Sequence, residues 1–232
     1  MEKLQGKDAG LGRKWENFWY YYKWYVIAGA FVLLIAVFFT VQSLTKKEPD
    51  ALLYYAGECY FGEEQAAALE NAVAETMKSD PNGDGKKQVQ LVATVLLSGE
   101  KQATAVHLAR DEQDDGSYIY AGNPADNQKE FHEQMAYGEA VICLLSEPFF
   151  EEAKKEGRLA AFSDTVGTAP AGAIDDYGIR LKDTAAGQYY EILKALPDDT
   201  VLCCKKPIVI HKKAEYRKQT DILRDFLAFS IG

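Results

Sequence analysis

The 232-residue sequence has few of the side chains that bind metals or act as nucleophiles, with three histidines and four cysteines. No cysteines form a C-x-x-C motif, and no cysteine–histidine spacing matches a zinc site, so zinc of that kind is excluded. The sequence also lacks a G-x-S-x-G elbow, an HExxH helix and a Walker loop, which are the common signatures of hydrolases and nucleotide-binding enzymes. We therefore expect a protein that is not an enzyme and holds neither a cofactor nor a metal.

The three histidines, His107, His132 and His211, are far apart in the sequence, and none stands beside an obvious nucleophile. Unless the fold brings two of them together, each is expected at the surface or at a strand edge. The acidic pair at 151–152 and the basic pair at 154–155 have i,i+3 and i,i+4 spacing. This spacing predicts ion pairs along one helix and needs no catalytic explanation.

The cysteines are Cys59, Cys143, Cys203 and Cys204, which would allow two bridges in an oxidising compartment. Adjacent residues seldom bridge without strain, so Cys203 and Cys204 are poor partners for each other. On a strand they would point to opposite faces, with one in the core. Cys143, inside the apolar run 141–145, is interpreted as a small buried hydrophobic residue.

Charged side chains are missing from one long stretch, Trp24–Val41. Eighteen helical residues extend about 27 Å, close to the hydrocarbon thickness of a bilayer. Aromatic residues, which suit the membrane interface, cluster just before and at the start of this stretch. They are Trp15, Phe18, Trp19, Tyr20, Tyr21, Tyr22, Trp24 and Tyr25. The sequence therefore predicts a transmembrane helix at residues 24–44, with membrane lipid as a partner.

The basic residues around the span predict its orientation. Those that precede it are Lys3, Lys7, Arg13, Lys14 and Lys23, and only Lys46 and Lys47 follow it closely. The positive-inside rule then places residues 1–23 in the cytoplasm as a tail with an aromatic belt. A cleavable signal peptide is the main alternative, but Thr40–Leu44 offers no small-x-small cleavage site. We expect a single-pass protein of the cell membrane, with a linker at 45–50 and an extracellular domain at 51–232.

Charge is divided unevenly along the chain. Residues 1–44 hold five basic and three acidic side chains, which leaves 21 basic and 32 acidic ones, so the nets are +2 and −11. A domain with this acidic excess is repelled by anionic lipid and by nucleic acid, which excludes nucleic acid as a partner. Ordinary solubility explains the acidity more simply than an acidic recognition surface does.

The sequence beyond the linker alternates apolar runs with amphipathic ones. Strands are expected at 51–56, 88–97, 139–145, 177–181, 200–204 and 208–211. Helices are expected at 62–78, 123–137, 147–157 and 214–229. Ser146 is a plausible cap for the third helix, with proline in its first turn and Gly157 as its stop. This succession predicts a three-layer α/β domain with a mostly parallel sheet.

The segment Asp80–Gly85 (DPNGDG) copies the first half of a calcium-binding loop, in which oxygen ligands converge around a sharp glycine turn. The second half is missing because position twelve is Leu91 instead of glutamate, and Lys86 and Lys87 add positive charge. We interpret the segment as a helix-to-strand turn whose residues tolerate left-handed dihedral angles.

Several segments carry a resemblance to a known family. Phe131–Asp164, with its run AYGEAVICLLSEPFFEEAKKEGRLAAFSD, resembles a helix–strand–helix segment of bacterial extracellular solute-binding proteins. The turn at 80–86, the aromatic run at 18–24 and Tyr177–Leu181 are similar to segments of that family and its membrane-anchored relatives. The chain has Ala140 and Val141 where the family places aspartate, and most of the second lobe is absent. The resemblance implies one lobe of a type 2 periplasmic-binding-protein fold.

In open α/β sheets, ligands contact the loops that follow the carboxyl ends of the strands. The ligand-binding candidates in those loops are Glu58, Cys59, Tyr60, Ser98, Ser146 and Glu147, with Gly99 beside them. Glu63 and Glu64 would occupy the start of the helix after the first strand, which disfavours an anionic ligand there. Capping and turn formation are the competing explanation for all these residues.

Two functions remain open. The first is a membrane-tethered extracytoplasmic solute-binding-like module, whose ligand the sequence does not identify. The second is an envelope interaction or accessory domain without a small-molecule ligand, with a transporter or another envelope protein as partner. A closed, aromatic-lined cleft favours the first, and a flat exposed apolar patch favours the second.

Overall fold

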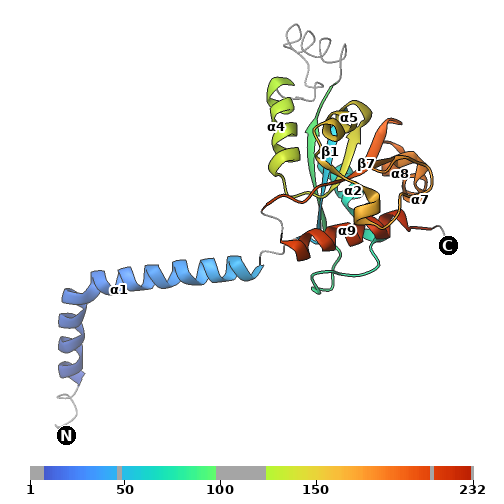
Figure 1. Cartoon of the computed structure of the whole chain (residues 1–232). Coiled ribbons are helices and arrows are strands. Elements are labelled where there is room, and N and C mark those ends of the chain that lie inside the picture. Colours follow the sequence, from blue (N-terminus) through green and yellow to red (C-terminus); the bar gives the residue numbers. More distant parts are fainter. Residues whose placement is uncertain (1–7, 46–48, 98–123, 210–211, 231–232) are drawn as a thin grey trace. The chain divides into compact units, whose positions relative to one another are not determined.

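The computed structural model describes residues 8–45, 49–97, 124–209 and 212–230, and it divides into two units, residues 1–48 and 49–232 (Figure 1). The first unit contains one helix, α1 (Asp8–Thr45). Its segment Trp19–Thr40 is long and apolar enough to cross a membrane, and none of its most apolar window is buried by protein. Helix α1 thus has the length and composition expected of the predicted membrane helix. A signal sequence would have the same length and composition.

The second unit is built around a seven-stranded sheet with the order β2-β1-β3-β7-β6-β5, in which β4 also pairs with β7. The strands are β1 (Ala51–Gly57), β2 (Val89–Val95), β3 (Ile142–Ser146), β4 (Leu159–Ala160), β5 (Ala173–Asp175), β6 (Gly178–Arg180) and β7 (Thr200–Lys205). Strands β2, β1 and β3 are parallel, whereas β7 is antiparallel to each of β3, β4 and β6. The sheet is therefore mixed, with one parallel and one antiparallel half.

Helices cover both faces of the sheet. They are α2 (Glu63–Thr76), α4 (Pro124–Tyr137), α5 (Glu147–Lys155), α6 (Phe162–Thr165), α7 (Ala185–Tyr189), α8 (Glu191–Lys194) and α9 (Lys213–Leu227), with a 3₁₀ turn η1 (Leu181–Asp183). Two clusters of buried side chains lie on opposite faces of the sheet. One includes residues of α2, α7, α8 and α9, and the other includes residues of α4 and α5. The three-layer α/β arrangement expected from the sequence is confirmed.

Strand β3 lies at the centre of this arrangement and is buried along its whole length. Ile142 and Leu144 belong to the cluster beneath α2 and α9, and Cys143 and Leu145 belong to the cluster beneath α4 and α5. This alternation is the one predicted from the apolar run. Val141 departs from it and packs in the same cluster as Ile142, because the strand begins only at Ile142.

Local sequence signals account for the ends of the helices. Helix α2 begins after Gly62, whose N–H donates to the side chain of Gln65 at 3.2 Å, and its first turn holds Glu63 and Glu64. Carboxylates in that position complement the positive end of the helix dipole. Helix α5 has proline in its first turn and ends before Gly157, which adopts a φ of 70°. Ser146 occupies the N-cap position of α5, but its side chain makes no capping hydrogen bond.

Part of the secondary-structure prediction was wrong. Ile208 and Val209 form no strand, and residues 210–211 lie outside the described part of the chain. Pro207 supplies no N–H for a sheet hydrogen bond, and Val209 is fully exposed, so the chain has left the sheet after β7. The predicted burial of Leu227 in α9 is only partial.

One cation is buried at the end of β7. Lys205 is 1 % exposed, and its ammonium group donates to the main-chain oxygens of Gln134, at 2.9 Å, and Gly138. These carbonyls lie in the last turn of α4 and just beyond it, where the helix dipole favours a cation, and the carbonyl of Gln134 also accepts the N–H of Gly138 at 2.9 Å. Burial lowers the pKa of Lys205. The residue joins the end of α4 to the central sheet.

Candidate functional site

The ends of β1, β2 and β3 lie along one edge of the parallel half, which we call the carboxyl edge. Because β7 is antiparallel to β3, its first residue lies there too, with Thr200 opposite Ser146. The end of β6 joins the same edge, since Arg180 pairs with Val201. Ser98, which was predicted to follow β2, is outside the described residues, as is Gly99.

The loop after β1 carries three of the predicted residues. The N–H of Cys59 donates to the hydroxyl of Tyr55 at 3.1 Å, and the buried ring of Tyr55 packs edge to face on Phe61 with 4.9 Å between ring centroids. Burial raises the pKa of Tyr55, so this hydroxyl stays protonated. Glu58 and Cys59 are half-buried, whereas Tyr60 is 52 % exposed. The bond from Cys59 to Tyr55 ties this loop back to β1.

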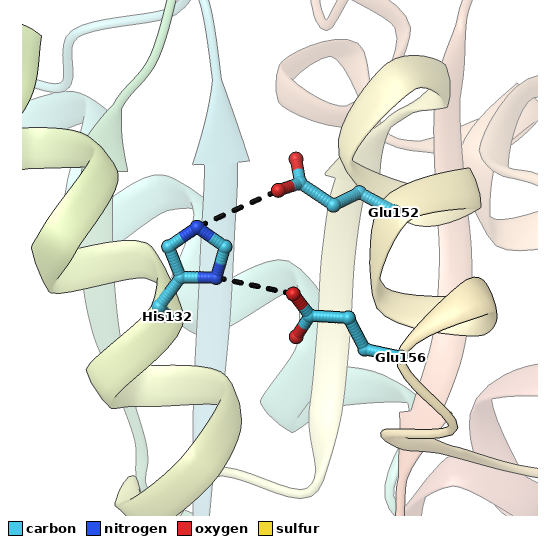
Figure 2. Close-up of side chains that lie close together, drawn as sticks. All are labelled: His132, Glu152 and Glu156. Atoms are coloured by element: carbon cyan, nitrogen blue, oxygen red, sulfur yellow. Dashed lines mark ion pairs between the residues drawn. The ribbon is translucent and has the colours of Figure 1, made fainter.

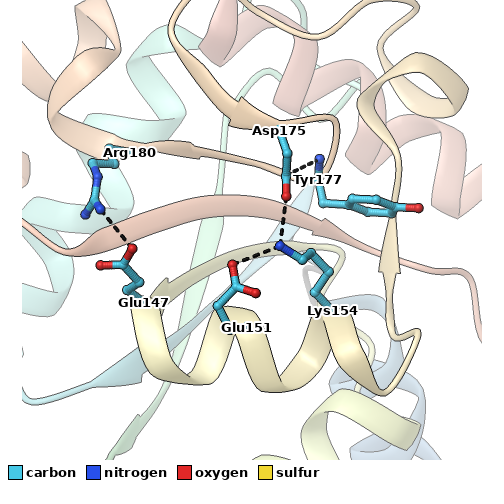
Figure 3. Close-up of polar contacts among 6 residues, drawn as sticks. All are labelled: Glu147, Glu151, Lys154, Asp175, Tyr177 and Arg180. Carbon is cyan, nitrogen blue, oxygen red and sulfur yellow. Dashed lines mark hydrogen bonds and ion pairs between the residues drawn. The ribbon is translucent and has the colours of Figure 1, made fainter.

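The two predicted residues after β3 have different surroundings. Ser146 is 5 % exposed and belongs to the strand itself, paired with Thr200. The carboxylate of Glu147 accepts from the guanidinium of Arg180 at 2.9 Å, as Figure 3 shows. Ser146 is thus closed to a ligand by the sheet, and the charge of Glu147 is already paired across the carboxyl edge.

A second ion-pair network fixes α5 against the β5–β6 hairpin. The ammonium group of Lys154 donates to Glu151 at 2.8 Å and to Asp175 at 2.9 Å, and Asp175 accepts the N–H of Tyr177 at 2.8 Å (Figure 3). Hydrogen bonds to Glu151 and Asp175 raise the pKa of Lys154. The i,i+3 pair predicted between the acidic and basic residues of this helix is confirmed at Lys154 and Glu151. In this network one ammonium group bridges two carboxylates and so ties α5 to the hairpin.

A hollow with a volume of about 240 Å³ lies next to the carboxyl edge, among the elements that connect β6 to β7. Its lining combines apolar and charged residues: Leu181, Lys182, Gly187, Gln188, Leu193, Lys194, Leu196, Pro197 and Asp198. Lys182 and Asp198 form an ion pair of 3.4 Å there, and Gln188 donates to the main-chain oxygen of Lys182 at 3.1 Å. None of these residues was predicted, because they lie in short elements without a clear periodic pattern.

A larger hollow of about 600 Å³ lies by the start of α9. Its lining includes Asp164, Thr165, Pro207, Lys213, Tyr216, Arg217, Thr220, Asp221 and Arg224. Pro207 follows the end of β7, so this hollow is at the opposite edge of the sheet from the predicted ligand loops. Arg224 pairs with Asp221 and also donates to the main-chain oxygen of Thr165 at 3.1 Å.

A cluster of histidine and glutamate residues lies between α4 and α5 (Figure 2). The Nε2 of His132 is 3.5 Å from Glu152 Oε1, and its Nδ1 is 3.5 Å from Glu156 Oε1. Gln128 and Arg158 approach the two carboxylates at 3.5 Å. His132 is a surface residue, as predicted, but the sequence did not indicate these partners. The i,i+4 spacing of the glutamates was visible, whereas the placement of α4 beside α5 was not.

The cysteines lie mainly in the core, and all four are free. Cys143 is fully buried on β3, directly opposite the fully buried Cys203 on β7. Cys203 and Cys204 belong to opposite core clusters, as predicted for neighbours on a strand. Burial raises the pKa of the Cys203 thiol, and it raises the pKa of Cys204 to about 12. Both are poor nucleophiles for that reason.

Known proteins give no further guide to this site. The chain matches no model of a protein family, no curated protein and no solved structure.

Proposed function

We propose that the chain is a membrane-tethered solute-binding-like module whose domain works outside the cytoplasm. The observation that carries this proposal is the hollow next to the carboxyl edge, at the end of β6. Open α/β sheets bind ligands at this edge, because loops that vary freely are held there by a rigid sheet. The uncharged span Trp24–Val41 within α1, preceded by five basic residues, supports the tether and its orientation.

The lining of the hollow restricts the ligand to a small solute. Leucines at 181, 193 and 196 offer apolar contacts, and Lys182 and Lys194 are the charged donors. Their ammonium groups are paired with Asp198 and with Glu191, the latter at 2.6 Å. The anionic group of a solute could replace Asp198 or Glu191 as the partner of a lysine, while the apolar part of the solute contacts the leucines. The electrostatic cost of this replacement is small, because an exposed ion pair contributes about 0–1 kcal/mol.

Thermal unfolding of the full chain in detergent tests this proposal. Single amino acids, dipeptides, and mono- and disaccharides serve as probes, and a ligand that stabilises the domain by about 1 kcal/mol should raise its melting temperature by about 2–4 °C. The variant Gln188→Trp fills the hollow from an exposed position and should abolish the response. Gln90→Trp makes the same change at an exposed site on β2 and should leave it intact. A probe that stabilises both variants equally would show that the ligand binds outside this hollow. The absence of a response to every probe would contradict the proposal that the domain binds a solute.

An envelope interaction domain is the second candidate, and an aromatic cluster favours it. Tyr189 is 50 % exposed and contacts Phe229 and Tyr190, with ring centroids 5.5 and 4.9 Å apart. Such rings are enriched at protein interfaces. A photo-crosslinking residue at 189 should give one adduct of discrete mass in living cells, and the same residue at 90 should give none. Equal labelling at both positions would argue against an interface.

The orientation has its own test. Protease added to intact cells should digest the domain and leave the amino-terminal tail intact, because the tail is proposed to be cytoplasmic. A domain that resists digestion in intact cells but is digested after lysis would show that the orientation is reversed.

A further inference from the structure

The two helices on one face of the sheet present three metal-ligating side chains to one another. His132 comes from α4, and Glu152 and Glu156 come from α5. Within the described residues, this is the group of at least three such side chains whose ligand atoms all lie within 4.8 Å of one another. Beside the group, Phe131 of α4 and Phe149 of α5 pack with ring centroids 5.2 Å apart, which joins the two helices there.

We propose that His132, Glu152 and Glu156 bind a divalent transition metal, with Zn²⁺ the best fit. An imidazole nitrogen with two carboxylate oxygens is a ligand set for zinc and its neighbours, whereas Mg²⁺ and Ca²⁺ prefer oxygen alone. This site goes beyond solute binding, and it is independent of the carboxyl edge.

The distances suit a small ion. Bonds of about 2.0–2.1 Å in a tetrahedron place neighbouring ligand atoms about 3.3–3.4 Å apart. The distance from His132 Nδ1 to Glu156 Oε1 is 3.5 Å, so this edge of the tetrahedron is nearly formed. Glu152 now faces the other ring nitrogen and must rotate to complete the set, which is feasible because its side chain is 34 % exposed. Water would occupy the fourth position.

The electrostatic surroundings of the cluster favour a cation, and one nearby group, Arg158, opposes it. Glu156 is the C-cap residue of α5, where the helix dipole is negative, so its carboxylate is unfavourably placed without a positive partner. Arg158 supplies part of that charge from 3.5 Å and would compete with the metal. Gln128 donates to Glu152 from 3.5 Å and would help to orient it as a ligand. With a neutral imidazole, the three ligands carry a charge of −2, which a divalent ion neutralises.

A protonated His132 that bridges both glutamates is the competing arrangement. It satisfies the same two contacts of 3.5 Å with two N–H donors. Metal binding requires the neutral ring, so a metal and a second ring proton exclude each other at the liganding nitrogen. The two arrangements differ in what happens when Zn²⁺ is added, which makes the choice between them experimental.

Calorimetric titration of the full chain in detergent with ZnCl₂ tests the proposal. The chain is purified without a histidine tag and treated with a chelator beforehand. We expect one site, lost in His132→Ala and weakened at least about tenfold in Glu156→Gln, because removing a ligand breaks the set. Glu133→Gln is the matched control, since Glu133 lies on α4 next to His132 and pairs instead with Lys129. MgCl₂ should give no heat at this site.

Thermal unfolding gives a second readout that does not depend on the heat signal. Zn²⁺ should raise the melting temperature of the wild type and of Glu133→Gln, because a ligand that joins α4 to α5 stabilises only the folded state. It should leave His132→Ala unchanged. Equal Zn²⁺ affinity in the wild type, His132→Ala and Glu156→Gln would overturn the proposal, and so would the absence of binding in the wild type.

Discussion

Replacing Ile142 by alanine should remove a large part of the stability of the domain. The side chain is 2 % exposed, and its strand lies between two others, with Leu53 on β1 and Cys204 on β7 as its register partners. It packs in the cluster beneath α2 and α9. Neighbours on every side limit the collapse of the resulting cavity, so the cost should lie within the range of about 2–5 kcal/mol seen for buried isoleucine.

Ile174→Ala provides the matched control, because it makes the same chemical change on the edge strand β5, where the side chain is 42 % exposed. Urea unfolding followed by circular dichroism measures both. With a slope of about 2 kcal/mol per molar urea, a loss of 3 kcal/mol lowers the midpoint by about 1.5 M. The control should shift it by less than about 0.5 M. A midpoint for Ile142→Ala as high as that of the control would refute a central, doubly covered β3.

Two further predictions concern the turn and the core thiols. The segment Asp80–Gly85 should bind no calcium tightly, because position twelve carries no carboxylate; calorimetry checks this, and a micromolar dissociation constant that vanishes in Asp84→Ala would contradict it. The free energy of unfolding should fall as pH rises above about 9, because the raised pKa of Cys204, about 12, keeps its proton in the folded state after the unfolded chain has released it. Urea midpoints near pH 8 and about pH 10 measure this fall in the free energy of unfolding. It should be at most about 1.4 kcal/mol per pH unit for each thiol, and it should be smaller in Cys204→Ser. If the pH dependence is unchanged in that variant, other groups cause the fall.

The turn itself follows the interpretation made from its sequence. It joins α2 to β2, and Gly83 and Gly85 adopt φ angles of 73° and 83°. Desolvation opposes ionisation of Asp80, but hydrogen bonds from the N–H groups of Gly85, Gly83 and Asn82 outweigh it and lower the pKa of this carboxyl. The carboxylate oxygens of Asp80 therefore already accept hydrogen bonds from the main chain of the turn.

The long elements were predictable from sequence because each buries one continuous stripe or run. Helices α2, α4, α5 and α9 and strands β1, β2, β3 and β7 lie within two or three residues of their expected bounds. The region between β4 and β7 was not predictable in the same way, except that β6 (Gly178–Arg180) lies within the strand expected at 177–181. Its strands have two or three residues and its helices four or five, which is too short for a period of 2.0 or 3.6 to emerge. The antiparallel direction of β7 depends on the path of that same region.

The candidate site shows the same division. Residues next to a long strand, such as Glu58 and Glu147, were placed at the carboxyl edge by strand ends alone. The hollow between β6 and β7, with Lys182 and Gln188 in its lining, required the path of the short elements. The contact of His132 with the glutamates of α5 required two helices, separate in sequence, to share one face of the sheet.

The antiparallel pairing of β3 with β7 has a consequence for synthesis and truncation. Strand β7 enters the sheet more than fifty residues after β3 and closes the side of β3 that β1 does not occupy. Until the ribosome has released residues 200–205, β3, which is apolar at four of its five residues, presents an open row of N–H and C=O groups to other chains. A nascent or carboxyl-terminally clipped domain is therefore exposed to strand exchange and aggregation, and the proposed membrane anchor, made first, would gather such incomplete domains on one surface.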